Sequence, residues 1–407
     1  MKRPAGGARK GKQPAAAAAR KGKQPTAAEQ LAIDTTYMAR CLEIADVHRG
    51  RTAPNPLVGC VIVKHGKVIA EGAHAGPGQD HAEIVALKQL KGMRAPGATL
   101  YVNLEPCNHH GRTPPCAPVV RDSGVARVVV GMKDPVWEHT GGIDLLRAAK
   151  IPVTVGVMEQ ACERFNRAFL VFYQSNRPAI TLKAAITLDG KIATISGQSK
   201  WITGPEARDD VMRLRDQSDA VMVGVGTVLA DDPWLTARRI GGRNPIRIVV
   251  DSQLRTPPTA HVLPRKAGPR TIFLTGLTAP ASREAALVGQ GAEVWRIPAH
   301  RNGRLQLWTV THRLAEQGIT SVLVEGGGEL HAYLLEHRMV DELVLYIAPK
   351  VVGGPAKSWV GGKGLASLPS AHKFVFDPDP VALGADLRLT ASPAPIPEPR
   401  PYDDDDD

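Results

Sequence analysis

Short apolar runs alternate with amphipathic segments along this chain, a pattern that predicts an α/β protein. The first series of strand-like runs covers residues 58–63, 68–71, 99–104, 125–130 and 153–157. A helix is expected from about Asp34, because Met38, Cys41 and Ala45 recur at helical spacing. Two further helices are predicted over residues 80–90 and 114–122, and Gly124 ends the second.

A second series of elements begins after the segment at residues 174–178. Its strand-like runs cover residues 180–184, 220–225, 246–251, 271–274, 322–325 and 343–348. A chain of 407 residues is also too long for one ordinary core, since domains usually hold about 100–200 residues. We therefore predict two α/β domains, at residues 34–174 and 178–392.

Both ends of the chain differ in composition from the two domains. Residues 1–33 repeat Gly-Lys-Gln-Pro around an alanine run, which predicts a disordered basic tail. Residues 393–407 form a Pro/Asp-rich tail. Of the net charge of +11, the basic tail carries +7 and the acidic tail −5, which leaves +9 on the domains. That charge suits a phosphorylated small substrate and a dinucleotide as well as it suits a nucleic acid.

The overall composition is that of a globular protein, with 43% hydrophobic and 22% charged residues. No apolar run reaches the roughly 20 residues that span a bilayer, and the basic N-terminus lacks the apolar segment of a secretory signal. We therefore expect a cytoplasmic protein with no membrane partner. Its five cysteines, an odd number, fit reduced thiols and metal ligation better than disulfides.

Four residues between positions 81 and 116 form a candidate zinc site. His81 and Glu83 open a predicted helix, Cys107 follows a predicted strand, and Cys116 opens the next predicted helix. One imidazole and two thiolates give Zn²⁺ three protein ligands and leave a fourth position for water. This His-x-Glu and Pro-Cys…Cys order is typical of zinc deaminases, in which the glutamate moves protons.

Two other interpretations of these residues are open. Asp80 and Glu83 have the spacing of a helix capping box. A structural zinc site would need a fourth protein ligand, which His109 or His110 could supply. The eight residues between the two cysteines, where the general signature has two, instead indicate a loop shaped for a particular substrate.

The stretch Glu105-Pro-Cys-Asn-His-His-Gly-Arg-Thr-Pro-Pro-Cys116, with the motif at residues 53–59 and His74, closely resembles the riboflavin-biosynthesis pyrimidine deaminases. The resemblance implies a cytidine-deaminase-like three-layer α/β/α domain. It also implies that Asn55 and His74 help to bind the pyrimidine, and that Arg112 suits the substrate's phosphate.

The second half carries weaker motifs that match one family when they are taken together. Glu325-Gly-Gly-Gly328 follows a predicted strand and precedes a helix, but lacks the full G-x-G-x-x-G spacing. With residues 188–191, 199–203 and 230–233, it resembles the reductase half of the bifunctional riboflavin-biosynthesis deaminase/reductase family. That half is similar in fold to dihydrofolate reductase and uses NADPH.

The resemblance implies site residues at matching positions of this chain. For NADPH they are Ala185, Trp201, Thr227, Asp231, Ser252, Gly326, Gly327 and Gly328. For the sugar phosphate they are Ser199, Arg215, Leu235, Arg238 and Glu325.

The predicted function is two consecutive reactions on one small-molecule pyrimidine nucleotide. Zinc-dependent deamination of 2,5-diamino-6-ribosylamino-4(3H)-pyrimidinone 5′-phosphate would precede NADPH-dependent reduction of its ribosyl chain. A nucleic-acid base deaminase is the first alternative, and a protein with one surviving activity is the second. The first would leave the second domain idle and would have few stacking surfaces, since aromatics make up 4% of the chain. We therefore predict no nucleic-acid partner, and we expect a homo-oligomer.

Overall fold

The computed structural model describes residues 25–111, 113–264 and 268–394, which form two compact units. The first unit comprises the chain up to residue 47, residues 58–74 and residues 78–162. The second comprises residues 48–57, 75–77 and the chain from residue 163 onward. Of the tails predicted at residues 1–33 and 393–407, residues 1–24 and 395–407 lie outside the described residues.

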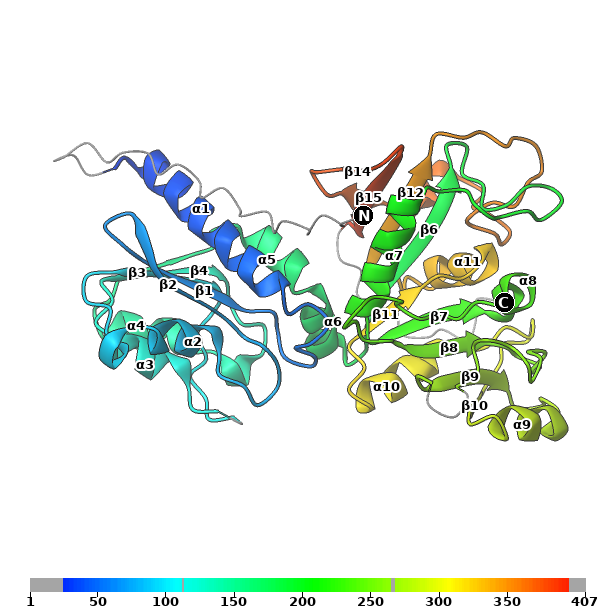
Figure 1. Cartoon of the computed structure of the whole chain (residues 1–407), viewed down its shortest axis with the longest axis horizontal. Helices are drawn as coiled ribbons and strands as arrows, with labels where there is room; N and C mark the ends of the chain where they lie inside the picture. Colours follow the sequence, from blue (N-terminus) through cyan, green and yellow to red (C-terminus); the bar gives the residue numbers. More distant parts are fainter. Residues whose placement is uncertain (1–24, 112, 265–267, 395–407) are drawn as a thin grey trace, which may run out of the picture. The chain divides into compact units, whose positions relative to one another are not determined.

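A five-stranded sheet forms the centre of the first unit, in the order β2-β1-β3-β4-β5. Its elements are α1 (Ala27–Asp46), β1 (Gly59–Lys64), β2 (Lys67–Ala73), α2 (Ala82–Lys88), η1 (Lys91–Met93), β3 (Thr99–Leu104), α3 (Cys116–Asp122), β4 (Arg127–Met132), η2 (Trp137–His139), α4 (Gly142–Ala148) and β5 (Val153–Val155). Strands β3, β4 and β5 run parallel, and β1 is antiparallel to β2 and β3. Helix α1 covers one face of the sheet and α2, α3 and α4 cover the other (Figure 1), which is the predicted three-layer arrangement.

Helix α1 begins earlier than the sequence predicted. The expectation that residues up to 33 are disordered is wrong for residues 27–33, which are helical. A capping box starts the helix: Thr26 Oγ1 accepts the N–H of Glu29 at 3.2 Å, and Glu29 accepts the N–H of Thr26 at 2.8 Å. Downstream, the buried Asp34 accepts two hydrogen bonds from Arg127 at 2.8 and 2.7 Å, which hold the helix against the sheet.

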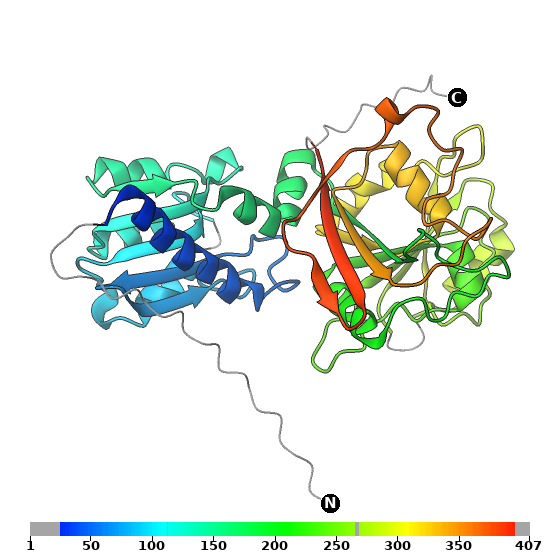
Figure 2. The same cartoon turned by 90° about the horizontal axis from the view of Figure 1, so that it is seen from above.

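The second unit is built on a ten-stranded, mostly parallel sheet (Figure 2). Its elements are α5 (Glu159–Phe165, which begins in the first unit), α6 (Arg167–Ser175), β6 (Ala179–Thr187), α7 (Pro205–Gln217), β7 (Ala220–Gly224), α8 (Val225–Asp231), β8 (Ile246–Val250), β9 (Thr271–Gly276), α9 (Ala281–Val288), β10 (Glu293–Ile297), α10 (Trp308–Glu316), β11 (Ser321–Val324), α11 (Gly328–Glu336), β12 (Glu342–Ala348), η4 (Leu368–Ser370), β13 (Phe374–Phe376), β14 (Val381–Leu383) and β15 (Asp386–Pro393). The strand order is β10-β9-β8-β7-β11-β6-β12-β15-β13, with β14 paired to β15.

Alternate residues of each central strand enter different apolar cores. Ala220 and Met222 of β7 pack with side chains of α10 and α11, whereas Val221 and Val223 pack with side chains of α8 and α9. Both faces of the sheet are therefore covered, as a parallel sheet requires. Strands β10, β13, β14 and β15 were not predicted from the sequence.

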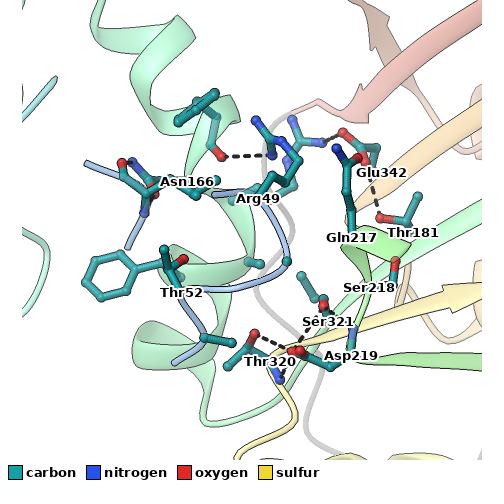
Figure 3. A pocket seen from close by; sticks show the side chains of 18 of the residues that line it. Arg49, Thr52, Asn166, Thr181, Gln217, Ser218, Asp219, Thr320, Ser321 and Glu342 are labelled. Carbon is teal, nitrogen blue, oxygen red and sulfur yellow. Dashed lines mark hydrogen bonds and ion pairs between the residues drawn. The ribbon is translucent and has the colours of Figure 1, made fainter. Parts of the chain in front are cut away.

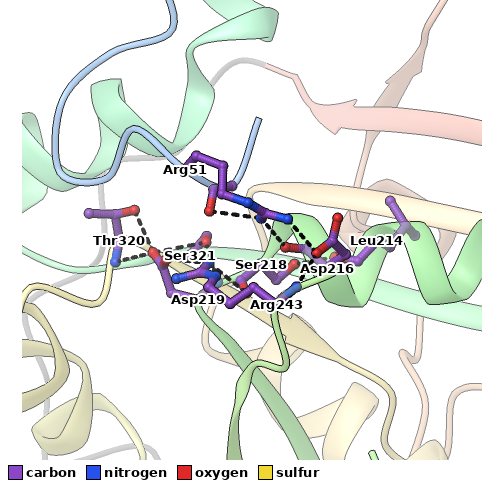
Figure 4. Close-up of polar contacts among 9 residues, drawn as sticks. Arg51, Leu214, Asp216, Ser218, Asp219, Arg243, Thr320 and Ser321 are labelled. Atoms are coloured by element: carbon purple, nitrogen blue, oxygen red, sulfur yellow. Dashed lines mark hydrogen bonds and ion pairs between the residues drawn. The ribbon is translucent and has the colours of Figure 1, made fainter. Parts of the chain in front are cut away.

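The segment at residues 48–57 lies between α1 and β1 in sequence, yet its contacts belong to the second unit. Arg51 Nη2 lies 2.7 Å from Asp216 Oδ1, and Arg51 Nη1 donates to the backbone oxygen of Asp216 at 3.1 Å (Figure 4). Asp216 also accepts the backbone N–H of Arg243 at 2.6 Å. The units therefore divide at residues 162–163 and at this segment, whereas the predicted domain boundaries lie at residues 174–178.

Over the described ranges, no helix combines the length and the apolar character that crossing a membrane requires.

Candidate active sites

The three predicted zinc ligands converge in the first unit. His81 immediately precedes α2, Cys107 follows the end of β3, and Cys116 is the first residue of α3. Their ligand atoms all lie within 4.8 Å of one another. Nδ1 of His81 is 3.1 Å from Cys116 Sγ and 3.5 Å from Cys107 Sγ. One imidazole nitrogen and two sulfurs that face one another fit Zn²⁺ with a fourth position open.

Hydrogen bonds within this cluster act in opposite directions on its two thiols. The Cys116 thiol and the His81 ring hold the pKa of the Cys107 thiol down to about 4. The backbone N–H of Cys116 also points at Cys107 Sγ, at 3.4 Å. Beside that sulfur, the pKa of Cys116 is raised. Because the thiolate is the form that binds a metal, the cluster favours ligation at Cys107 first.

Glu83 lies within the same cluster and is 3% exposed. Burial, together with the negative charge at Cys107, raises the pKa of its carboxyl group to about 7. A carboxyl group with that pKa can take up and release a proton near neutral pH. The capping-box interpretation is wrong, because His81 is the N-cap and makes no side-chain cap bond, while Asp80 pairs with Lys88 at 2.5 Å.

The other predicted residues of the deaminase half are placed unevenly. His74 is buried, its Nδ1 lies 3.0 Å from the carbonyl oxygen of Asp80, and its ring edge faces His81. Nδ1 therefore carries the hydrogen, which fixes the ring beside the ligand cluster. Asn55 belongs to the second unit by its contacts, and Arg112 lies outside the described residues. Their roles, like that of His74, stay predictions.

The long loop between the cysteines supplies no fourth ligand among the residues that the structure describes. The cluster of candidate ligands consists of His81, Cys107 and Cys116, and it includes neither His109 nor His110. His109 instead stacks on His139, with ring centroids 4.2 Å apart and planes 12° apart. A purely structural zinc site therefore has no support in these coordinating groups.

Glu105 is a residue of this site that the sequence did not single out. Its buried carboxylate accepts the backbone N–H groups of Gly141 and Ile143, both at 3.1 Å, and that of Asp134 at 3.4 Å. These bonds tie the segment after β3, which carries Cys107, to the start of α4. The sequence signal that could have identified Glu105 is an acidic residue directly before the Pro-Cys pair.

The predicted reductase residues gather at the carboxyl edge of the parallel sheet in the second unit. Thr227 follows β7, Ser252 follows β8, and Glu325 follows β11. A Cβ placed on Gly327 would lie 4.0 Å from Thr227 Oγ1, so two residues predicted for NADPH are neighbours. Ligands of open α/β sheets bind at this edge, where successive strands deliver their loops.

A buried charge cluster lies at the same edge. Arg215 donates to both carboxylate oxygens of Glu325, at 2.5 and 2.9 Å. Lys183 Nζ lies 3.8 Å from Oε2 of the same carboxylate. Burial alone would raise the pKa of Glu325, but the charges of Arg215 and Lys183 keep it below its usual range. Lys183 was not predicted; a lysine within the apolar run of β6 was the signal for it.

The predicted substrate and cofactor loops also meet. Ser199 Oγ lies 3.4 Å from Asp231 Oδ1, so a residue predicted for the sugar phosphate contacts one predicted for NADPH. Arg238 is exposed, and its charge acts on Glu325. Trp201 is 64% exposed, and the guanidinium group of Arg208 lies 4.5 Å from its ring centroid.

A separate cavity of about 170 Å³ lies in the second unit, around Thr52, Asn166 and Glu342 (Figure 3). Asn55 is among its lining residues. Two of its charged side chains pair with each other, Arg167 and Glu342 at 2.6 Å, and Thr181 donates a hydrogen bond to the Glu342 carboxylate. We assign no chemistry to this cavity.

Two family models match the chain. The cytidine and deoxycytidylate deaminase zinc-binding region matches residues 31–132, and the RibD C-terminal domain matches residues 178–381. The first match contains His81, Glu83, Cys107 and Cys116, and the second contains the predicted reductase residues.

Curated relatives match across both units. The chain is 43% identical to the riboflavin biosynthesis protein RibD of Actinobacillus pleuropneumoniae over 347 residues, which are 84% of this chain and 90% of that protein. It is likewise 43% identical to RibD of Escherichia coli over 357 residues, 84% of this chain and 95% of that protein.

Solved structures agree with these relatives. A diaminohydroxyphosphoribosylaminopyrimidine deaminase/5-amino-6-(5-phosphoribosylamino)uracil reductase from Thermotoga maritima is 34% identical, with a TM-score of 0.76 over 89% of this chain and 99% of that one. Acinetobacter baumannii RibD is 35% identical, with a TM-score of 0.74 and the same coverage.

Proposed function

The chain belongs to the RibD family of bifunctional deaminase/reductases of riboflavin biosynthesis, and from this premise we propose which of its residues carry each reaction. The observation that carries the proposal is the convergence of His81, Cys107 and Cys116 beside a buried Glu83. A second, separate cluster at the carboxyl edge of the parallel sheet supports the reductase assignment.

In the deaminase half, His81, Cys107 and Cys116 would hold zinc, which when bound would lower the pKa of a water from ~16 towards ~7. Glu83 takes the proton of the attacking water and delivers it to the departing nitrogen. Water supplies the oxygen of the new ring carbonyl, and the amino group leaves as ammonia. The buried position of Glu83, with its pKa raised to about 7, suits both directions of that proton transfer.

His74 and Asn55 recognise the ring, and Arg112 is the residue that we assign to the phosphate. His74 is oriented by its Nδ1 hydrogen bond to the backbone of Asp80, so its ring stays beside the ligand cluster. The substrate is 2,5-diamino-6-ribosylamino-4(3H)-pyrimidinone 5′-phosphate. The similar Thermotoga maritima protein is a deaminase and a 5-amino-6-(5-phosphoribosylamino)uracil reductase, and that uracil is the product expected from this deamination.

In the reductase half, bound NADPH would supply the hydride that converts the ribosyl chain to a ribityl chain. The residues that would hold it are Ala185, Trp201, Thr227, Asp231, Ser252, Gly326, Gly327 and Gly328. Ser199, Arg215, Leu235, Arg238 and Glu325 bind the sugar phosphate. Arg215 is already matched by Glu325, so the exposed Arg238 is the arginine free to add charge-assisted bonds to a phosphate. Glu325 then orients Arg215 and Lys183 towards the sugar.

The proposal also covers the oligomeric state of the protein and its cellular compartment. We expect a homo-oligomer in the cytoplasm with a small-molecule substrate, and sedimentation of the purified protein would give the subunit number.

The test uses ammonia release and NADPH oxidation on the purified protein. Glu83→Ala should abolish ammonia release and leave NADPH oxidation on the deaminated nucleotide unchanged. The matched control is Glu138→Ala, an exposed acid of the same unit, which should leave both activities intact. Loss of both activities or of neither in Glu83→Ala would contradict a two-site enzyme.

A further inference from the structure

The loop at residues 231–238 has an unusual backbone conformation at two residues of the proposed reductase site, Leu235 and Arg238, and at Asp232, which follows a third. Asp232, Leu235 and Arg238 have φ angles of 40°, 51° and 49°, in the left-handed region that non-glycine residues rarely adopt. Such a backbone persists only when its surroundings determine it strongly. The loop must therefore be held by contacts from outside itself.

One end of the loop is held by residues of the proposed site. Arg215 Nη1 donates to the backbone oxygen of Thr236 at 3.1 Å, and Asn244 accepts the N–H of Ala237 at 3.0 Å. Leu235 is 2% exposed and packs in a core cluster that includes Val262. These contacts fix the part of the loop that precedes Arg238.

The other end is held by His261, which lies 29 positions further along the chain. The backbone N–H of His261 donates to Asp232 Oδ1 at 2.8 Å, and its Nδ1 lies 2.7 Å from Asp232 Oδ2 and 3.2 Å from the Asp232 carbonyl oxygen. Because Nδ1 faces two acceptors, it carries a hydrogen. The imidazole also stacks on Trp234, with ring centroids 4.4 Å apart and planes 24° apart.

We propose that His261 is a positioning residue for the reductase reaction, acting through Asp232 and Trp234 on the loop that bears Asp231, Leu235 and Arg238. This inference rests on the proposed function. His261 contacts Asp232 and Trp234, which are adjacent parts of one loop. Removing either contact should let the loop leave the conformation that binds the substrate. The apparent affinity of a ligand falls in proportion to the populated binding conformation.

The side chains of His261 and Asp232 are 37% and 49% exposed, so their pairing adds little to overall stability. Loss of the contact should therefore affect substrate binding more than folding. That separation distinguishes a positioning residue from a structural one.

Two single variants separate the contacts of His261. His261→Asn keeps a donor near the Nδ1 position and loses the stacked ring, whereas His261→Phe keeps a ring and loses the donor. Each should raise the KM for the deaminated nucleotide about 3- to 10-fold, with kcat within about twofold of the starting protein. Adding Trp234→Ala to His261→Asn should change KM little further, because the stack is already absent.

Ammonia release by the same chain reports folding of the first unit and should not change, whereas the thermal midpoint of unfolding reports folding of the second unit, which holds His261. The matched control is His312→Asn, because His312 also meets a tryptophan ring, Trp308, at 5.4 Å and has its Nδ1 3.0 Å from a backbone oxygen. It should leave the reductase KM unchanged.

An unchanged KM in both His261 variants would overturn the inference, as would a lowered thermal midpoint that accompanies any rise in KM, or an equal rise in His312→Asn. Absence of NADPH oxidation in the unsubstituted chain would instead overturn the proposed function, and this inference with it.

Discussion

Replacing Glu83 by glutamine should remove deaminase activity and stabilise the chelator-treated protein. The carboxyl group is 3% exposed and its pKa is raised from 4.5 to about 7. One pKa unit corresponds to about 1.4 kcal/mol, so keeping this group ionised in the folded state costs about 3 kcal/mol. Glutamine has the shape of the protonated acid and carries no charge, so it avoids that cost.

The sign of the effect follows from the raised pKa. The folded state binds the proton more tightly than the unfolded state, so Glu83 costs little below pH 4.5 and its cost grows as pH rises to about 7. The stability gain of Glu83→Gln should therefore increase from under about 1 kcal/mol at pH 5 to about 3 kcal/mol at pH 8. Zinc should shrink the gain, since its positive charge stabilises the carboxylate.

Urea unfolding of chelator-treated protein, followed by far-ultraviolet circular dichroism at pH 5 and pH 8, measures this difference. The relevant transition is the one that added zinc shifts. Glu138→Gln, which changes an exposed acid, should show no comparable gain. An equal gain at both pH values, or a loss of stability at pH 8, would refute the argument that burial holds this carboxyl group protonated.

Three further outcomes are expected. Chelation of zinc should abolish ammonia release and leave NADPH oxidation on the deaminated nucleotide intact, as paired assays on one sample would show. Deleting residues 1–24 should leave nucleotide turnover unchanged and create no activity on RNA; lost turnover or measurable RNA deamination would revive the nucleic-acid interpretation. Asp34→Asn should cost about 2 kcal/mol at pH 7, because it weakens a buried pair with Arg127. Although burial works in the opposite direction, hydrogen bonds from Arg127 keep the pKa of Asp34 lowered, so this cost should shrink in urea titrations as pH falls below the usual value of 3.8.

The zinc site could be predicted from the sequence because each ligand sits at the end of a regular element. His81 precedes α2 and Cys116 opens α3, and both helices were expected within two residues of their observed starts. The strand before Cys107 was predicted with its observed bounds, residues 99–104. Strands β2 and β3 are both antiparallel to β1 and therefore end at the same edge of the sheet, so spacing along the chain was informative about contacts in space.

The reductase site depends on contacts that no local pattern encodes. Arg215 and Glu325 are 110 positions apart, and their pairing follows from β11 lying beside β7 in the middle of the sheet. The family resemblance identified both residues as candidates, but the structure was needed to show that they form an ion pair. Lys183 was overlooked because one lysine within an apolar run marks an unusual position in a strand but does not identify the residue that it pairs with, Glu325.

The early start of α1 was missed for a different reason. Residues 27–33 follow a low-complexity stretch, and composition favoured disorder, whereas the reciprocal bonds of Thr26 and Glu29 provide a defined helix start. Strands β13 and β14 have three residues each, too short for an alternating pattern to stand out, and pair with β15.

The candidate ligand cluster and the buried charge cluster lie in different compact units, and this determines how their roles can be separated. His81, Glu83, Cys107 and Cys116 belong to the first unit, whereas Lys183, Arg215 and Glu325 belong to the second. Glu325→Gln would leave Arg215 and Lys183 without their shared counter-charge, and removing one partner of a buried ion pair costs about 3–5 kcal/mol. That cost falls on the second unit, so NADPH oxidation should be lost while ammonia release continues. Joint loss of both activities in Glu325→Gln would mean that the deaminase cluster depends on the second unit, which its own contacts do not require.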